Sequence, residues 1–217
     1  MPKFFLIDTT RCIACRGCQI ACKAWNKLPA GKTRQTGTYE NPPDLDAHTY
    51  RIVRFREYPD EKNSVKWYFF PEACRHCIDP PCKEVADEYV KDAIIVDKNG
   101  AVIFTEKTKL LGKNAEDVIA ECPYNIPRLD IETGRLTKCH MCHTRIRQGL
   151  EPACVKACST GALVFGNEMQ IKSLSEKRLD QARKKFGNKA QLINPDEVRA
   201  IYLIVDEPEK YYEFATY

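Results

Sequence analysis

The 217-residue sequence lacks the short motifs that mark many active sites. It contains no nucleophile paired with a base, no phosphate-binding loop and no glycine pattern typical of dinucleotide-binding folds. No substrate chemistry is therefore visible in its residues. We expect a chain without a catalytic residue, and an electron carrier is the function that remains.

The sequence also has little that could enter a membrane. The longest clean apolar run near the C-terminus, AIYLIV at 200–205, has the length of a strand, whereas a spanning helix needs about 20 apolar residues. Only a short apolar run, FFLI, precedes Cys12, and Cys12 follows before a cleavage site would fit. We therefore expect neither a membrane span nor a signal peptide on this chain.

Cysteine, by contrast, is abundant. All twelve cysteines except Cys122 fall in C-x2-C, C-x3-C or C-x4-C groups, whereas a disulfide framework would scatter them, so metal ligation is the better interpretation. Three oxidised four-iron clusters, each about −2 with its thiolates, would turn the formal charge of +4 into about −2. The basic excess thus indicates counter-charge for metal rather than nucleic-acid binding. Arg16 and Arg75, which lie inside cysteine runs, fit that view equally with being solvated surface arginines.

The first cysteine group has the spacing of a bacterial ferredoxin. Residues 11–26, RCIACRGCQIACKAWN, follow the pattern C-x2-C-x2-C-x3-C. In this pattern the first three cysteines hold one cubane and the fourth ligates another cluster, so the run requires a partner run. The partner lies near the other end of the chain, at 139–158. The expected ligand sets are Cys12, Cys15, Cys18 and Cys158 for cluster 1, and Cys22, Cys139, Cys142 and Cys154 for cluster 2.

A third group, between these runs, is incomplete. A full run beginning at Cys74 would place a cysteine at 86, and a run closed by Cys122 would place three more at 112, 115 and 118. Those positions hold Ala86, Gly112, Ala115 and Val118. By the same exchange of ligands, the four missing thiolates belong to one lost cluster. The remaining four, Cys74, Cys77, Cys82 and Cys122, should then share cluster 3.

Other interpretations of these residues stay open. Zinc could bind the two cysteine pairs at 139–158, which would make the chain a non-redox scaffold, although the groups at 12–22 and 74–82 do not divide into pairs. Several side chains near the cysteines could be ligands, proton carriers or electron relays, but packing beside a cluster is the simpler interpretation. They are His76, His140, His143, Trp25, Trp67 and Tyr124.

Hydrophobic patterning predicts short elements around the cysteine groups. The predicted strands are 3–7, 49–57, 65–70, 93–97, 101–105 and 162–166, with a further strand in 199–217. The predicted helices are 19–27, one opened by Asn114 and ending near 122, and 174–186. Residues 29–46 should form a long ordered loop, with hairpin turns at 59–64 and at Asn99-Gly100.

We therefore predict an α+β protein of two ferredoxin-like iron–sulfur modules, the second inserted into the first. Residues 1–48 and 136–170 form a module with two clusters, and residues 49–135 form an inserted module with one. Residues 171–217 form a C-terminal helix and strand that pack on the core or on a partner.

The order of the cysteine groups identifies a family resemblance. The segments CIACRGCQIACKAWN, FFPEACRHCIDPPC, ECPYNIPR and KCHMCHTRIRQGLEPACVKACSTGA resemble the iron–sulfur β subunits of the dimethyl sulfoxide reductase superfamily. These subunits normally hold four clusters. With one cluster missing, the chain resembles the β subunit of soluble, two-subunit tungsten or molybdenum formate dehydrogenases, which holds three [4Fe-4S] clusters. The resemblance implies electron transfer from a large molybdopterin catalytic subunit to a soluble carrier such as a cytochrome c. The alternative is the same role in a polysulfide or thiosulfate reductase.

This sequence departs from the family pattern in two places. Ser159 follows Cys158 where proline is usual, and the C-terminal membrane helix of anchored formate dehydrogenase β subunits is absent. The second departure favours a soluble acceptor. The resemblance further implies a periplasmic protein, exported together with a partner that bears a twin-arginine signal, or a cytoplasmic protein if the partner lacks such a signal.

Overall fold

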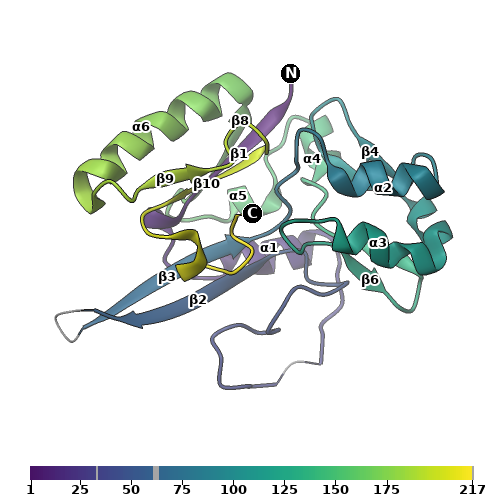
Figure 1. Ribbon diagram of the computed structural model, residues 1–217, viewed down its shortest axis with the longest axis horizontal. Helices are drawn as coiled ribbons and strands as arrows, with labels where there is room; N and C mark the ends of the chain where they lie inside the picture. The colour runs from purple at the N-terminus through teal and green to yellow at the C-terminus, as the bar shows by residue number, and fades with distance from the viewer. Residues whose placement is uncertain (33, 61–63, 217) are drawn as a thin grey trace.

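The computed structural model of this chain describes residues 1–32, 34–60 and 64–216. At its centre lies a four-stranded sheet in the order β8–β1–β10–β9. Its strands are Lys3–Asp8 (β1), Leu163–Asn167 (β8), Gln191–Ile193 (β9) and Ala200–Ile204 (β10). β1 pairs parallel with β10 and antiparallel with β8. The first and last strands of the chain therefore lie side by side in the middle of the sheet (Figure 1).

Both faces of β1 are buried because its side chains alternate between two hydrophobic clusters. Phe4 and Leu6 pack with apolar residues of the helix α6 (Glu168–Phe186). Phe5 and Ile7 point to the other face, where they share a cluster with several cysteines. The helix α6 crosses the first face of the sheet (Figure 1), so β1 separates a helix layer from the cysteine loops.

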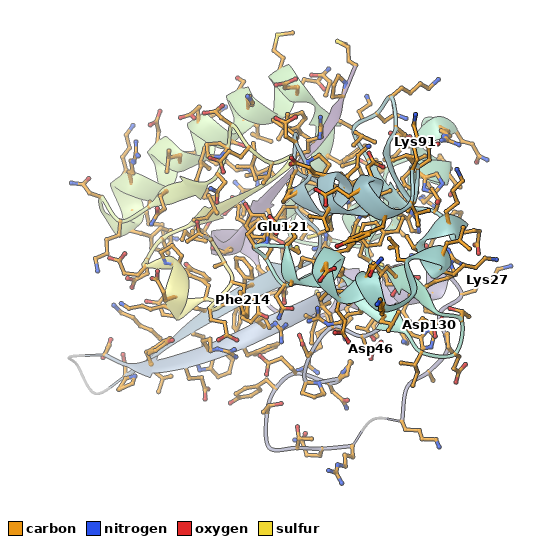
Figure 2. All side chains as sticks on the ribbon, turned by 45° about the vertical axis from the view of Figure 1, so that its right-hand side comes forward. Lys27, Asp46, Lys91, Glu121, Asp130 and Phe214 are labelled. Atoms are coloured by element: carbon orange, nitrogen blue, oxygen red, sulfur yellow. The ribbon has the colours of Figure 1, made fainter. Side chains whose placement is uncertain are left out.

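A hairpin of β2 (Ile52–Pro59) and β3 (Val65–Glu72) extends from this frame (Figure 1). The predicted turn at 59–64 includes residues 61–63, which lie outside the described residues. The segment after β10 packs against the hairpin, since the ring centroids of Tyr68 and Tyr211 lie 4.9 Å apart. Figure 2 shows the end of this segment, with Phe214 labelled, beside the hairpin.

The cysteine motifs lie on short helices and loops around the sheet. The helices next to the first and last motifs are α1 (Gly17–Trp25), α4 (His143–Arg147) and α5 (Ala153–Lys156). The middle of the chain, which lies across the molecule from α6 (Figure 1), holds α2 (Pro81–Tyr89), β4 (Ile94–Val96), β5 (Val102–Phe104), α3 (Ala115–Ala120), β6 (Arg128–Asp130) and β7 (Arg135–Thr137). Three 3₁₀ helices are η1 (Thr9–Arg11), η2 (Glu106–Asn114) and η3 (Pro208–Lys210). In the part of the chain that the structure describes, no helix is long and apolar enough to span a membrane.

Helix boundaries are the main difference from the predicted elements. The helix α6 begins at Glu168 rather than at 174, because Asn167 accepts a hydrogen bond from Gln170 N at 2.9 Å and Gln170 reciprocates in a capping box. Asn114 precedes the helix α3 as predicted, but its side chain makes no capping hydrogen bond, and α3 continues directly from η2. The helix α2, which begins at Pro81, was not predicted.

The positions of the four missing cysteines are filled by a small apolar core. Ala86, Ala115 and Val118 are each at most 1% exposed and belong to one hydrophobic cluster with Leu111. Gly112 lies at the kink within η2, with a φ of 56°. Three of the four replaced positions thus pack together, and aliphatic contacts hold α2, η2 and α3 in place.

We expect Val118→Ala to weaken this core, because two buried methyl groups are removed, at a cost of about 1–3 kcal/mol. The measurement is the apparent melting temperature of the iron-loaded protein, with iron content determined in parallel. Val65→Ala is the matched control, since Val65 is 61% exposed on β3. Equal melting temperatures for the two variants would contradict the role assigned to Val118.

Candidate metal centres

Three C-x-x-C loops share one backbone geometry. In each loop the residue before the second cysteine has a positive φ, which non-glycine residues seldom adopt. These residues are Ala14 (53°), His76 (51°) and Met141 (58°). Each donates its N–H to the sulfur of the first cysteine, at 3.5 Å for Cys12, 3.3 Å for Cys74 and 3.4 Å for Cys139. The loops are therefore shaped to surround a sulfur with backbone donors.

The first group of thiols brings Cys158 to the opening motif. Burial raises the pKa of the Cys12 thiol to about 11; the Ala14 N–H opposes this rise, and the nearby thiols of Cys158 and Cys15 add to it. Cys158 Sγ accepts a hydrogen bond from Leu163 N at 3.3 Å. Cys158 thus lies beside cysteines that are distant in the sequence.

The second group gathers around Cys22. Cys18 and Cys22 are one turn apart on α1, and both are buried. Burial raises the pKa of the Cys22 thiol well above its ordinary value, and the thiols of Cys139, Cys154 and Cys142 raise it further. The fourth cysteine of the opening motif therefore faces the second cysteine run.

The third group surrounds a cavity in the middle segment. The four cysteines of this cavity are Cys74, Cys77, Cys82 and Cys122. Burial raises the pKa of the Cys77 thiol to about 12, and the thiols of Cys74 and Cys122 contribute. The loop that carries Cys74 and Cys77 is fixed to the central sheet, since Ala200 N donates to Arg75 O at 2.9 Å.

The second group is the neighbour of both others. Burial is the main cause of the raised pKa of the Cys18 thiol, and the thiol of Cys154 raises it further. Burial likewise raises the pKa of the Cys139 thiol, and the thiol of Cys74 contributes. Cys15, in the first group, is exposed, whereas the other eleven cysteines are buried or half-buried. The first group therefore reaches closest to the surface.

The donor set fits [4Fe-4S] clusters. Each group offers four thiols, and all twelve cysteines are free rather than disulfide-bonded. Four thiolates around one zinc ion lie about 3.8 Å apart, given Zn–S bonds of about 2.3 Å. Among the described residues, no group of three or more His, Cys, Asp or Glu side chains is placed to hold a single metal ion. Ligands at the corners of a cubane stand further apart than those of a single ion, so this result is consistent with cubane ligands.

Two buried cations lie among the thiols, and the sequence analysis did not single them out. Arg51 is 4% exposed, and its Nη1 donates to Pro71 O at 3.0 Å. Lys138 is 6% exposed, and its Nζ donates to the carbonyl oxygens of Val102 at 2.6 Å and Cys139 at 2.9 Å. Adjacency to Cys139 was a signal for Lys138, but nothing in the sequence marks Arg51.

The two arginines inside the cysteine runs stack on aromatic rings. The guanidinium of Arg75, which is 1% exposed, lies 3.8 Å from the ring centroid of Tyr202. The guanidinium of Arg16 lies 5.0 Å from the ring centroid of Phe55. Arg75 also lines the cavity of the third group.

The three histidines beside the cysteines bond to protein groups. His76 is fully buried, and its Nδ1 accepts from Val102 N at 3.1 Å. His140 Nε2 lies 2.7 Å from Asn26 Oδ1, and the Nδ1 atoms of His140 and His143 are 3.2 Å apart. Burial lowers the pKa of His140 to about 4, and the second-largest cause of this lowering is the charge of His143. Packing beside the thiols is the role these contacts support.

The aromatic residues differ in position. Tyr124 is buried and lines the cavity of the third group. Trp25 is 44% exposed beneath the guanidinium of Arg145. Trp67 is 51% exposed on β3 and contacts Phe69.

We expect Asn26→Ala to lower the reduction potential of one cluster. Asn26 Nδ2 donates to Cys22 Sγ at 3.5 Å, and hydrogen bonds to ligand sulfurs stabilise the added negative charge of the reduced state. A loss of about 1 kcal/mol corresponds to about 40 mV for one electron. The measurement is a redox titration followed by electron paramagnetic resonance, with Asn188→Ala, on the exposed surface, as the control. Retention of the wild-type potentials at full iron content would rule this role out.

Comparisons with known proteins agree with this donor set. A family model described as a 4Fe-4S dicluster domain matches residues 65–168. The chain is 52% identical over 217 residues to formate dehydrogenase 2 subunit beta (cytochrome c-553) of Nitratidesulfovibrio vulgaris, and covers 99% of both proteins. It is 47% identical over 216 residues to formate dehydrogenase subunit beta of Megalodesulfovibrio gigas, again with 99% of both covered. It is also 35% identical over 212 residues to the iron–sulfur subunit of the nitrate-inducible formate dehydrogenase of Escherichia coli, covering 95% of this chain and 70% of that one.

Proposed function

Because this chain belongs to the iron–sulfur β subunits of formate dehydrogenases, we propose that it relays electrons through three [4Fe-4S] clusters from a large catalytic subunit to a soluble acceptor. The observation that carries this proposal is the convergence of twelve free cysteines into three groups of four. The chain supplies ligands, spacing and electrostatic tuning, while the oxidation of formate belongs to the metal-pterin centre of the partner.

The proposed ligand sets pair distant segments of the chain. The thiol contacts described above support the sets Cys12, Cys15, Cys18 and Cys158 for cluster 1, Cys22, Cys139, Cys142 and Cys154 for cluster 2, and Cys74, Cys77, Cys82 and Cys122 for cluster 3. Each cluster, when bound, accepts and releases one electron at a time. The contacts between neighbouring groups favour the order 1–2–3, with cluster 1 next to the surface.

We further propose two ferredoxin-like modules within the α+β fold, one inserted into the other. Residues 1–48 and 136–170 would hold clusters 1 and 2, and residues 49–135 would hold cluster 3. The central sheet supports the first module, because β1 and β8 pair within it, and β10 from the C-terminal segment lies between β1 and β9.

The acceptor and the compartment are also proposals. The printed name of the relative from Nitratidesulfovibrio vulgaris includes cytochrome c-553, and a small soluble cytochrome suits a cluster whose ligand Cys15 is exposed. We propose such a cytochrome as the acceptor and the periplasm as the compartment, reached by export together with the catalytic subunit.

The test begins with the complex purified without oxygen. A large molybdopterin protein should copurify with this chain, formate should bleach the clusters, and the chain should contain about twelve iron atoms. Cluster reduction by formate distinguishes this function from the same role in a polysulfide or thiosulfate reductase. A preparation that contains zinc in place of iron, or whose clusters ignore formate, would refute the proposal.

Cys158→Ser tests the pairing of distant cysteines. It should remove or alter only cluster 1, while the signals of clusters 2 and 3 persist. Complete loss of cluster 1 would lower the iron content from about twelve to about eight atoms per chain, and an altered cluster would give a value between these two. The neighbouring Ser159→Ala is the matched control and should keep all three clusters. Loss of cluster 2 with cluster 1 intact would show that Cys158 belongs with its neighbours in sequence.

A further inference from the structure

We propose that Arg51 and Lys138 are fixed positive charges that raise the reduction potentials of the clusters, Arg51 acting on clusters 1 and 2 and Lys138 on cluster 3. This inference rests on the ligand sets of the proposed function. It assigns a tuning role to two side chains that hold no cluster themselves.

Both side chains are buried, and within the described residues their hydrogen-bond acceptors are carbonyl oxygens alone. Arg51 donates to Pro71 O, and Lys138 donates to Val102 O and to the carbonyl of its neighbour Cys139. Arg54, which lies on β2 and is equally buried, is neutralised by a carboxylate, since its Nε lies 2.6 Å from Glu72 Oε2. A buried charge without such a partner is costly. For Arg51 and Lys138, the nearby source of negative charge is therefore the thiolate clusters.

The position of Arg51 suits a charge shared by two clusters. The thiols that its charge reaches belong to both ligand sets. They are Cys12 and Cys18 of cluster 1, and Cys22, Cys139 and Cys142 of cluster 2. Because Arg51 is only 4% exposed, solvent screens its charge little.

Lys138 has the corresponding position at cluster 3. It lines the same cavity as the four cysteines of that cluster. Its ammonium also lies 4.6 Å from the ring centroid of Phe104, in an apolar wall where a charge is weakly screened. Its chain neighbour Cys139 belongs to cluster 2, so Lys138 stands at the boundary between clusters 2 and 3.

The sign of the effect follows from charge balance. Reduction adds one negative charge to a cluster that is already anionic, and a buried cation stabilises the reduced form more than the oxidised one. Removal of the cation should therefore lower the midpoint potential of the clusters it faces. Clusters on the far side should change less, because the interaction weakens with distance.

The experiment uses the intact iron-loaded complex and a redox titration followed by electron paramagnetic resonance. Arg51→Met and Lys138→Met remove the charge but retain a long apolar side chain. Arg51→Met should make reduction of clusters 1 and 2 at least tenfold less favourable, a shift of about 59 mV for one electron, with less effect on cluster 3. Lys138→Met should do the same to cluster 3 and leave cluster 1 unchanged. Signals are assigned to clusters with single Cys→Ser ligand variants.

Three controls separate tuning from packing. Arg51→Lys and Lys138→Arg keep the charge and should restore potentials close to those of the wild type. Lys172→Met removes a half-exposed charge on α6 that is already paired with Glu168 and Asp196, and should shift no cluster. Unchanged potentials in both methionine variants at full iron content, or equal shifts of all three clusters in both, would overturn the inference.

Iron analysis makes the remaining outcomes decisive. If a methionine variant loses iron, the variant that keeps the charge at the same position must retain the iron content and the midpoint potentials of the wild type. Equal loss in both members of a pair would show that the side chain acts by packing alone and would overturn the inference. Wild-type complex without about twelve irons would instead refute the proposed function on which the inference rests.

Discussion

The constraint on which the structure depends is the burial of thiolate clusters inside a small protein. Anionic groups within an apolar interior are costly unless donors or cations surround them. Cysteines from both ends of the chain must converge, and the sheet makes this possible by pairing β1, which leads into Cys12, with β8, which follows Cys158. The same sheet fixes the third cysteine loop, because Ala200 N donates to Arg75 O and Ile78 N donates to Glu197 O at 2.8 Å. The fold therefore serves to hold three groups of sulfur atoms at set positions.

Two kinds of compensation surround these sulfurs. Backbone N–H groups reach the sulfurs through left-handed turns at Ala14, His76 and Met141, and buried cations supply charge from further away. The first kind acts on a single sulfur at hydrogen-bond distance. The second acts over several thiols, since its field falls off slowly where solvent is excluded. A chain that passes electrons between clusters needs both, because each cluster's potential must be set in relation to its neighbours.

Cysteine spacing predicted the family, because ligand exchange between runs follows from geometry that the spacing itself encodes. The two strands around Asn99-Gly100 were also predicted, whereas β6, β7 and β9 were not. The positions of Arg51 and of the helix α2 were not, because their environments arise from contacts between segments distant in sequence. The capping box at Asn167 was visible in the sequence, and its omission placed the start of α6 too late. The ligand sets stay predictions.

An apolar core explains how the middle segment stays folded without a full set of cysteines. Ala86, Ala115 and Val118 fill their positions with an apolar core, so α2 and α3 remain packed although they bind no cluster there. Those same helices flank Cys82 and Cys122, two of the proposed ligands of cluster 3. Aliphatic packing has therefore taken over the structural task that a cluster would perform. On this reasoning the apolar core stands where a further cluster would lie, and it still positions the helices that flank the cavity of the third cysteine group.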